Sequence, residues 1–358
     1  MPEITDIVLR TISVFVAVLL AALLTTHSRH RQRAVPGALF VLAVAAFWIT
    51  SAPGAVSTLG VWGWPLIGLC VTKTVFFWLL SRSLFNEKAS LNPNLAGVLI
   101  TIAMIGIWQQ TVFIQEYRAG TASTLETLMG FGFDLVLAGF VLMGLYVAWR
   151  DLAVDLVERR RHLRIVFMLA TGVYLVFAIV VQFWNLASGT ETSQVVSWVN
   201  MSVTSLVFLG AGWLLLQFRN ESWLAPLRTA STSQLSRVES AVLSQLERLL
   251  KDDRVYLQEG LTIAKLAGQL GTGEHVLRKV INQGMGHRNF NDFLHSWRIS
   301  EACEELARPE QAREPVLSIA MKVGYGSIGA FNRAFKAKVG MTPTAFRRSR
   351  LGGMLQAR

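Results

Sequence analysis

The chain has 358 residues, a formal net charge of +11, 52% hydrophobic residues and only 16% charged residues. This length allows two domains, and so apolar a composition excludes an ordinary soluble protein. Cys70 lies in an apolar run and Cys303 in a polar region, so the two cysteines exclude a disulfide framework. No residue pattern indicates a metal site or a cofactor.

Charge divides the chain into two parts. Residues 221–358 contain 20 Lys or Arg against 13 Asp or Glu, a net charge of +7, and eight basic but no acidic residues follow Glu314. A basic end without carboxylates favours contact with phosphate, although a solvated tail or a contact with anionic lipid would have the same composition. We predict an apolar domain at 1–218, a linker at 219–236, a helical domain at 237–350 and a basic tail at 351–358.

The apolar domain contains seven apolar runs. Each has about the 20 residues that a helix needs to cross about 30 Å of hydrocarbon, which predicts an all-α bundle of seven transmembrane helices. Glu3 and Asp6 stand where a signal peptide would be positively charged, so we expect the first run to remain as an anchor. Residues 53–64 could instead form a re-entrant segment. The runs are 7–26, 34–52, 64–81, 95–114, 125–149, 165–184 and 195–218.

Basic residues gather in alternate loops between these runs. The second and sixth loops contain none and the fourth contains only Arg118, which predicts an outer N-terminus and a cytoplasmic C-terminal domain at a bacterial inner membrane. The outer loops have about ten residues each, too few for a ligand-binding domain, so we expect a signal to act within the bundle or the bilayer. The basic residues of the odd-numbered loops are Arg29, Arg31, Arg33, Arg82, Lys88, Arg150, Arg159, Arg160, Arg161 and Arg164.

Two charged residues stand inside the predicted spans. At 1.5 Å per residue, Lys73 in the third span and Asp134 in the fifth would lie ~12 and ~13.5 Å deep. An isolated charge there costs at least ~2.5 to 3.5 kcal/mol, so such residues normally find partners. We hypothesise that Lys73 and Asp134 form an ion pair that senses a small molecule, a lipid or a proton. A static pair that only fixes helix packing is the alternative.

A helical pattern resumes beyond the linker. Leu235, Val238, Val242, Leu246 and Leu249 recur at three- and four-residue spacing, which predicts an amphipathic helix. This helix would be either a coiled coil that continues from the last span or the first helix of the next domain.

Two helix-turn-helix patterns follow. In the first, an apolar helix from Leu261 to Ala267 is followed by the glycine turn 271–273 and a helix at 274–283. In the second, a helix from Val316 is followed by Gly324, Tyr325 and a helix that begins near Ser327. The same supersecondary unit is thus repeated.

The helix predicted at 274–283 has two different faces, of which the apolar one should pack on the preceding helix. On the other face, Arg and Lys pair with guanine and Asn with adenine when a helix lies in the major groove, although a solvated surface would contain the same residues. His275 has no second ligand at suitable spacing, so we interpret it as a DNA contact rather than a metal ligand. The apolar residues are Val276, Leu277, Val280 and Ile281, and the polar residues are Glu274, His275, Arg278, Lys279 and Asn282.

Residues 237–347 resemble the DNA-binding domain of the arabinose-regulator (AraC) family of bacterial transcription factors. The resemblance implies two recognition helices, 274–283 and 327–338, on one rigid domain that enters successive major grooves. It also implies base contacts by His275, Arg278 and Lys279 from the first helix and a DNA contact by Arg333 from the second. The matching residues are Arg298-Ile299, Ala302, Ile319-Ala320, Val323-Gly324-Tyr325, Phe331, Arg333, Phe335-Lys336, Gly340-Met341-Thr342-Pro343 and Phe346-Arg347.

The chain departs from this family pattern in both recognition helices. Gly273 stands where the family usually has a hydroxyl cap, an aromatic core position is Ile281, and Ile328 and Gly329 stand where it often has polar side chains. We therefore expect the second unit to contribute mainly phosphate contacts and shape recognition. The residues expected to contact DNA there, besides Arg333, are Ser327, Asn332, Lys336 and Arg347.

These features together predict a membrane-integrated, sequence-specific transcription regulator of the AraC type. The expected partners are double-stranded DNA and a lipid bilayer, with a second copy of the chain as a homodimer partner and a small-molecule, lipid or proton signal as further candidates. An enzyme is not expected, since no nucleophile with its base is evident. A retinal-type photoreceptor is not expected either, because the seventh run lacks a lysine for a Schiff base. The alternative is a transport or scaffold protein whose helical cytoplasmic tail binds other proteins.

Overall fold

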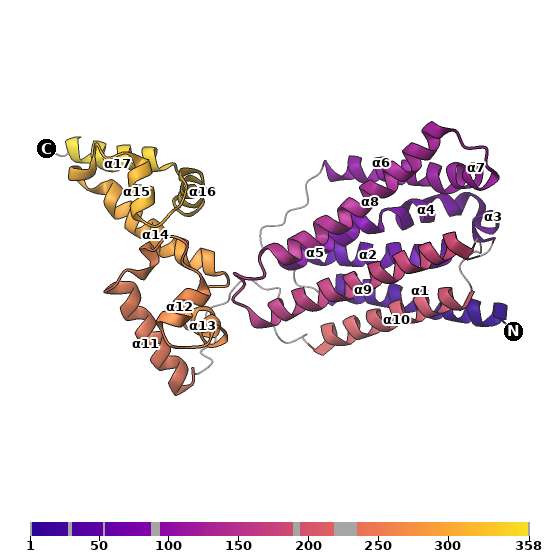
Figure 1. Cartoon of the computed structure of the whole chain (residues 1–358), viewed down its shortest axis with the longest axis horizontal. Coiled ribbons are helices and arrows are strands. Elements are labelled where there is room, and N and C mark those ends of the chain that lie inside the picture. The colour runs from indigo at the N-terminus through magenta and orange to yellow at the C-terminus, as the bar shows by residue number, and fades with distance from the viewer. Residues whose placement is uncertain are drawn as a thin grey trace. The chain divides into compact units, whose positions relative to one another are not determined.

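The computed structural model describes residues 2–27, 31–52, 54–86, 94–188, 194–217 and 235–356 (Figure 1). Every element in these ranges is a helix, and one isolated bridge joins Asp155 to Asn289. The chain forms two compact units, 1–150 with 164–226 and 151–163 with 227–358. The short segment 151–163, which lies between two apolar runs of the sequence, thus belongs to the C-terminal unit.

The first unit is a bundle of long helices that run roughly parallel to one another (Figure 1). α1 packs against α2 and α10, α2 packs against α4 and α5, and α5 packs against α8. The helices are α1 (Pro2–His27), α2 (Arg31–Thr50), α3 (Ala55–Leu59), α4 (Gly63–Val71), α5 (Lys73–Phe85), α6 (Leu95–Trp108), α7 (Ile114–Ala119), α8 (Thr124–Arg150), α9 (Glu158–Ser188) and α10 (Gln194–Gln217), with a 3-10 turn at Gly60–Trp62 and a π-helical turn at Gln109–Phe113.

Three of the described helical segments are long and apolar enough to cross a membrane: Ile4–Thr26, Leu95–Phe113 and Thr124–Arg150. A fourth results if Gly60–Val71 and Lys73–Phe85, which are bent by 45°, count as one span, although such a pair also fits a re-entrant loop. Ala34–Thr50 is apolar but shorter. Helices α9 and α10 occupy the sixth and seventh runs, but the side chains of 175–194 and 208–217 are outside the described part, so the count of seven stays a prediction.

Some of the sequence predictions fall outside the described residues. Arg29 and Lys88, two of the residues that set the predicted orientation, lie in 28–30 and 87–93. Most of the predicted linker lies in 218–234, and the tail is described only up to residue 356.

Buried polar contacts join the helices of this unit. Arg164 near the start of α9 is 1% exposed and donates to the carbonyl oxygens of Phe85 at 3.0 Å and Ala148 at 3.1 Å, so it satisfies the ends of both α5 and α8. Ser13 of α1 and Ser205 of α10 are hydrogen-bonded at 2.6 Å. Hydrogen bonds between buried hydroxyl groups are typical of helices that pack in an apolar surrounding.

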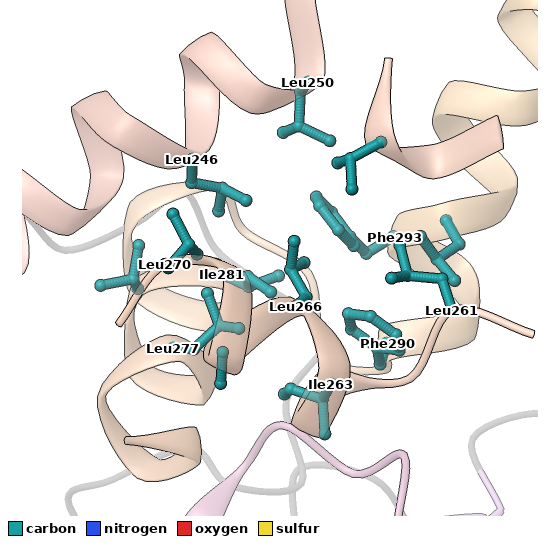
Figure 2. Close-up of a cluster of buried hydrophobic side chains, with 14 of the residues drawn as sticks. Leu246, Leu250, Leu261, Ile263, Leu266, Leu270, Leu277, Ile281, Phe290 and Phe293 are labelled. Carbon is teal, nitrogen blue, oxygen red and sulfur yellow. The ribbon is translucent and has the colours of Figure 1, made fainter. Parts of the chain in front are cut away.

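The second unit contains seven α-helices in its described C-terminal part, and two apolar clusters form its core. Figure 2 shows the first cluster, in which side chains from α11, α12, α13 and α14 point toward one another. The second cluster contains Phe331 and Phe335 and lies between α14, α15, α16 and α17. The helices are α11 (Arg237–Lys251), α12 (Ile263–Gln269), α13 (Glu274–Lys279), α14 (Phe290–Ala307), α15 (Val316–Lys322), α16 (Ile328–Val339) and α17 (Pro343–Gln356), with 3-10 turns at Val255–Leu257 and Pro309–Gln311 and a π-helical turn at Val280–Gly284.

Helix α11 is the first helix of the C-terminal part of this unit. Ser236 and Glu239 form a capping box at its N-terminus, and Val242, Leu246 and Leu250 are buried in the first cluster. This packing supports the second of the two alternatives that the sequence left open. The buried face is shifted from the predicted one, because Val238 is 67% exposed while Leu250 lies inside.

Candidate nucleic-acid interface

The first helix-turn-helix consists of α12, a glycine turn and α13. Thr262 caps α12 by accepting a hydrogen bond from the Lys265 amide, and Gly271 adopts a φ of +61° in the turn. Glycine adopts this left-handed conformation without the steric cost of a Cβ atom. Gly273 precedes α13 without a side-chain cap, as the departure from the family pattern led us to expect. The four predicted apolar residues of the recognition helix pack in the first cluster, which confirms that face.

The second helix-turn-helix consists of α15, a turn at Gly324 and α16. Gly324 has a φ of +85°, and a Cβ atom there would lie 2.6 Å from the Leu257 carbonyl oxygen. Ser327 caps α16 by accepting a hydrogen bond from the Ala330 amide at 3.3 Å. Phe331 and Phe335 are fully buried on one side of α16, so the opposite side of this helix faces outward.

Helix α14 connects the two helix-turn-helix units through an arginine and a histidine. Arg298 donates to the carbonyl oxygens of Tyr256 at 2.6 Å and Gln258 at 2.8 Å, and its guanidinium lies over the Tyr325 ring. His295 is hydrogen-bonded to the Tyr325 hydroxyl at 2.8 Å. Burial, and then the charge of Arg298, lowers the pKa of His295, and burial raises the pKa of Tyr325 to about 12. Both groups are therefore neutral near pH 7.

The outward face of α16 carries exposed basic side chains. Asn332, Arg333 and Lys336 are exposed, and neither basic residue forms an ion pair with any residue that the structure describes. Lys338 lies 3.7 Å from the Asp292 carboxylate. Unpaired cations on an exposed helix next to a glycine turn can contact phosphate without first breaking an internal bond.

Two other predicted contacts of the second unit have structural partners. The Ser327 hydroxyl serves as the cap of α16, which leaves it less available for DNA. Arg347 on α17 is half-buried, and its Nη1 lies 3.4 Å from the Ala312 carbonyl oxygen. Its Nε and Nη2 are buried without a hydrogen-bond partner among the described residues.

The residues predicted to contact DNA from the first recognition helix differ in their exposure and in whether they already have a partner within the protein. His275 is exposed, and Lys279 is exposed but paired at 2.7 Å with Glu239 of α11. The hydrogen bond from Lys279 is the main reason why the pKa of the Glu239 carboxyl lies below its usual value. Asn282 is half-buried and donates to the His287 carbonyl oxygen at 2.9 Å.

Arg278 is buried, contrary to the expectation that it points into solvent. It is only 2% exposed, and its Nη1 donates at 2.9 Å to the carbonyl oxygens of both Ala153 and Asp155. Its Nη2 donates to Glu274 at 2.9 Å, and its Nε lies 3.9 Å from Glu158. The segment 151–163 therefore covers one of the residues that the resemblance assigns to base contact.

Sequence reasoning missed the role of this segment. We interpreted it from its arginines alone, as a cytoplasmic loop. A signal was present in the sequence, because Leu152-Ala153-Val154 and Leu156-Val157 are apolar residues that no predicted span requires. Leu156 is 1% exposed within the first cluster.

Lys73 and Asp134 are not brought together by the structure. The Lys73 ammonium lies 5.1 Å from the centre of the Phe47 ring and 4.0 Å from the Cys70 sulfur. Asp134 accepts a hydrogen bond at 2.9 Å from the Gln109 side chain. The expected ion pair assumed straight helices, whereas the chain breaks at Thr72 between α4 and α5 and winds into a π-helical turn at Gln109–Phe113.

The fold of residues 235–356 is a helical domain with two helix-turn-helix units, and a comparison with known protein families found the same motif. Residues 266–349 match a family described as a helix-turn-helix domain. The match supports an AraC-type DNA-binding domain, which is a regulator domain and not an enzyme family. No curated protein and no solved structure matches the chain.

Proposed function

We propose that the chain is a membrane-integrated transcription regulator in which an AraC-like domain binds specific DNA and an apolar helix bundle senses a signal. The observation that carries the proposal is the pair of helix-turn-helix units fixed on α14. The outward face of the second unit presents the cations Arg333 and Lys336, which form no ion pair with a described residue. A domain with this face gains affinity for DNA by releasing counterions from phosphates.

The membrane part of the proposal is supported by the apolar helices of the first unit. Three described helices reach the length and composition of a span, and the exposed large apolar side chains of α8 include Leu128, Leu135 and Leu142. Exposing so large an apolar surface to water is unfavourable, whereas contact with lipid tails is not. The inner-membrane location and the cytoplasmic C-terminal domain follow from the distribution of Lys and Arg in the sequence.

The full chain in lipid nanodiscs tests DNA binding directly. We expect the binding constant for duplex DNA to fall linearly with salt concentration on a double logarithmic plot, with a slope of about −0.9 for each phosphate contacted. A cytoplasmic tail that binds proteins would show no measurable affinity for duplex DNA at physiological salt. That result would favour the transport or scaffold alternative.

The sensing part centres on Asp134. Its carboxylate accepts from Gln109, which also donates to the Gly130 carbonyl oxygen at 3.2 Å. Gln109 therefore links the π-helical turn to α8 through two hydrogen bonds. Protonation of Asp134, or a ligand bound to it, would change these hydrogen bonds. Asp134→Asn should change promoter output while the protein still inserts into the membrane. Lys73→Met applies the same measurement to the second intramembrane charge. Wild-type responses in both stable variants would exclude a sensory role for these charges.

A further inference from the structure

The segment 151–163 is built into the DNA-binding unit although it is not part of that domain in sequence. The Leu156 amide donates to the Arg288 carbonyl oxygen at 2.9 Å, and the Phe290 amide donates to the Val154 carbonyl oxygen at 2.9 Å. Between these two bonds, Asp155 and Asn289 form an antiparallel bridge. With Leu156 buried in the first cluster, the segment has backbone pairing and an apolar anchor.

The segment also has an internal ion pair that holds its shape. The Asp155 side chain is 1% exposed and accepts from Arg160 Nε at 2.7 Å and Nη2 at 3.0 Å. It also accepts from the Val157 amide at 3.1 Å, which turns the chain into the first residues of α9. Because of this turn, the carbonyl oxygens of Ala153 and Asp155 both accept from the same nitrogen of Arg278.

The docked segment and a base compete for one guanidinium. An arginine that recognises guanine uses two of its N–H groups on the O6 and N7 acceptors of the base. In this structure Nη1 and Nη2 of Arg278 are already bound to two carbonyl oxygens and to Glu274, and Glu158 faces its Nε. Carboxylates at this position also repel the phosphates that a base contact would bring near.

The segment connects two helices of the bundle, so a movement of those helices can affect its contact with Arg278. Residue 151 follows directly on α8, and 158–163 are the first residues of α9, whose later residues belong to the helix bundle. A shift of α8 relative to α9 must therefore move or strain the segment. No other described part of the bundle's sequence is included in the DNA-binding unit.

We propose that the segment 151–163 is an autoinhibitory element that holds Arg278 away from DNA and releases it when α8 and α9 move, a mechanism that rests on the proposed DNA-binding function. Docking and base contact by Arg278 are mutually exclusive. The docked form retains the cations of α16, so it still binds DNA of any sequence. The released form gains the contact that distinguishes the cognate site.

A reversible cross-link tests the proposal. The pair Asp155 and Asn289 lies between two hydrogen bonds, an arrangement with Cα atoms about 4.5 Å apart, within the range of a disulfide. The full chain would carry Asp155→Cys and Asn289→Cys, with Cys70→Ser and Cys303→Ser to remove the native thiols. It would be studied in nanodiscs with duplex fragments recovered by chromatin immunoprecipitation of the intact protein and with random duplexes of equal length.

We expect the oxidised protein to bind recovered fragments about tenfold or more weakly than the same protein after reduction, with no difference on random duplexes. Adding Arg278→Ala should keep the affinity low in both redox states. The single variants Asp155→Cys and Asn289→Cys, which cannot form this bond, should not respond to reduction.

Two results would overturn the proposal. Equal affinity of the cross-linked and reduced forms for the recovered fragments would show that the segment does not obstruct Arg278. Asp155→Cys also removes the ion pair with Arg160, so a segment that normally docks should either form the bond or, once released, raise the affinity for the recovered fragments above that of the wild-type chain. Failure of the cysteines to join without such a rise, or a bond only between two copies, would show that the segment does not dock on its own domain. Loss of all DNA binding in the wild-type chain would instead contradict the proposed function itself, so the two failures are distinguishable.

Discussion

Gly324→Ala should destabilise the second helix-turn-helix far more than Gly271→Ala destabilises the first. Both glycines have a positive φ, +85° and +61°, so alanine costs ~1 to 2 kcal/mol at either position. At Gly271 a Cβ atom would meet nothing within 4 Å. At Gly324 it would lie 2.6 Å from the backbone oxygen of Leu257, and relieving such an overlap costs a further ~1 to 3 kcal/mol. We therefore expect a total loss of ~2 to 5 kcal/mol for Gly324→Ala.

The thiol of Cys303 offers a local measurement of this effect in the full chain. Cys303 packs against the second cluster, and burial raises its pKa, so its reaction with a maleimide should be slow until that cluster opens. Labelling would be followed in increasing urea in a Cys70→Ser background. Equal urea midpoints for the Gly324→Ala and Gly271→Ala proteins would refute the idea that the close approach of Leu257 makes this glycine necessary.

Three further predictions concern DNA binding, topology and pH. Lys336→Ala should weaken binding to all DNA sequences alike and lower the salt slope by about one. The control Lys251→Ala on α11, outside both helix-turn-helix units, should change neither the affinity nor the slope. A loss of affinity confined to one sequence would show that Lys336 contacts a base. A reporter fused after Arg33 should be cytoplasmic and one after Ser188 outside, and finding both on the same side would contradict the seven-span topology. Burial lowers the pKa of His295 in the folded protein, so below pH ~6.5 the unfolded chain takes up a proton at this residue more readily than the folded chain does. The folded state is therefore less stable at low pH, and the protease resistance of this unit in urea should fall as the pH drops below ~6.5. His295→Gln should remove that dependence, and an unchanged pH profile would assign it to another group.

The parts of the fold that the sequence predicted well are those fixed by local spacing. The apolar face of α13 and the turn at Gly324 follow from helical periodicity and from a glycine that precedes a capping serine, both of which act within a few residues. The amphipathic pattern of α11 was recognisable, but its buried face was not fully predicted, since Leu250 and Val238 are both apolar and differ only in what they pack against.

The parts that the sequence did not predict depend on contacts between distant residues. Arg278 and Ala153 are 125 positions apart, and a polar residue on a helix has the same sequence pattern whether it faces DNA, water or another segment. Lys73 and Asp134 were placed by counting residues along straight helices. The break at Thr72 and the π-helical turn that brings Gln109 to Asp134 change no hydropathy pattern, so that calculation could not include them.

The central claim is that one chain both resides in a membrane and binds specific DNA. Cells would be cross-linked, their membranes floated through a density gradient, and the DNA that floats with the intact protein sequenced. We predict a small number of discrete loci, which disappear in the Arg333→Ala and Lys336→Ala double variant and persist in Lys251→Ala. Floated protein that carries no DNA, or DNA spread evenly over the genome and unaffected by the double variant, would contradict the account.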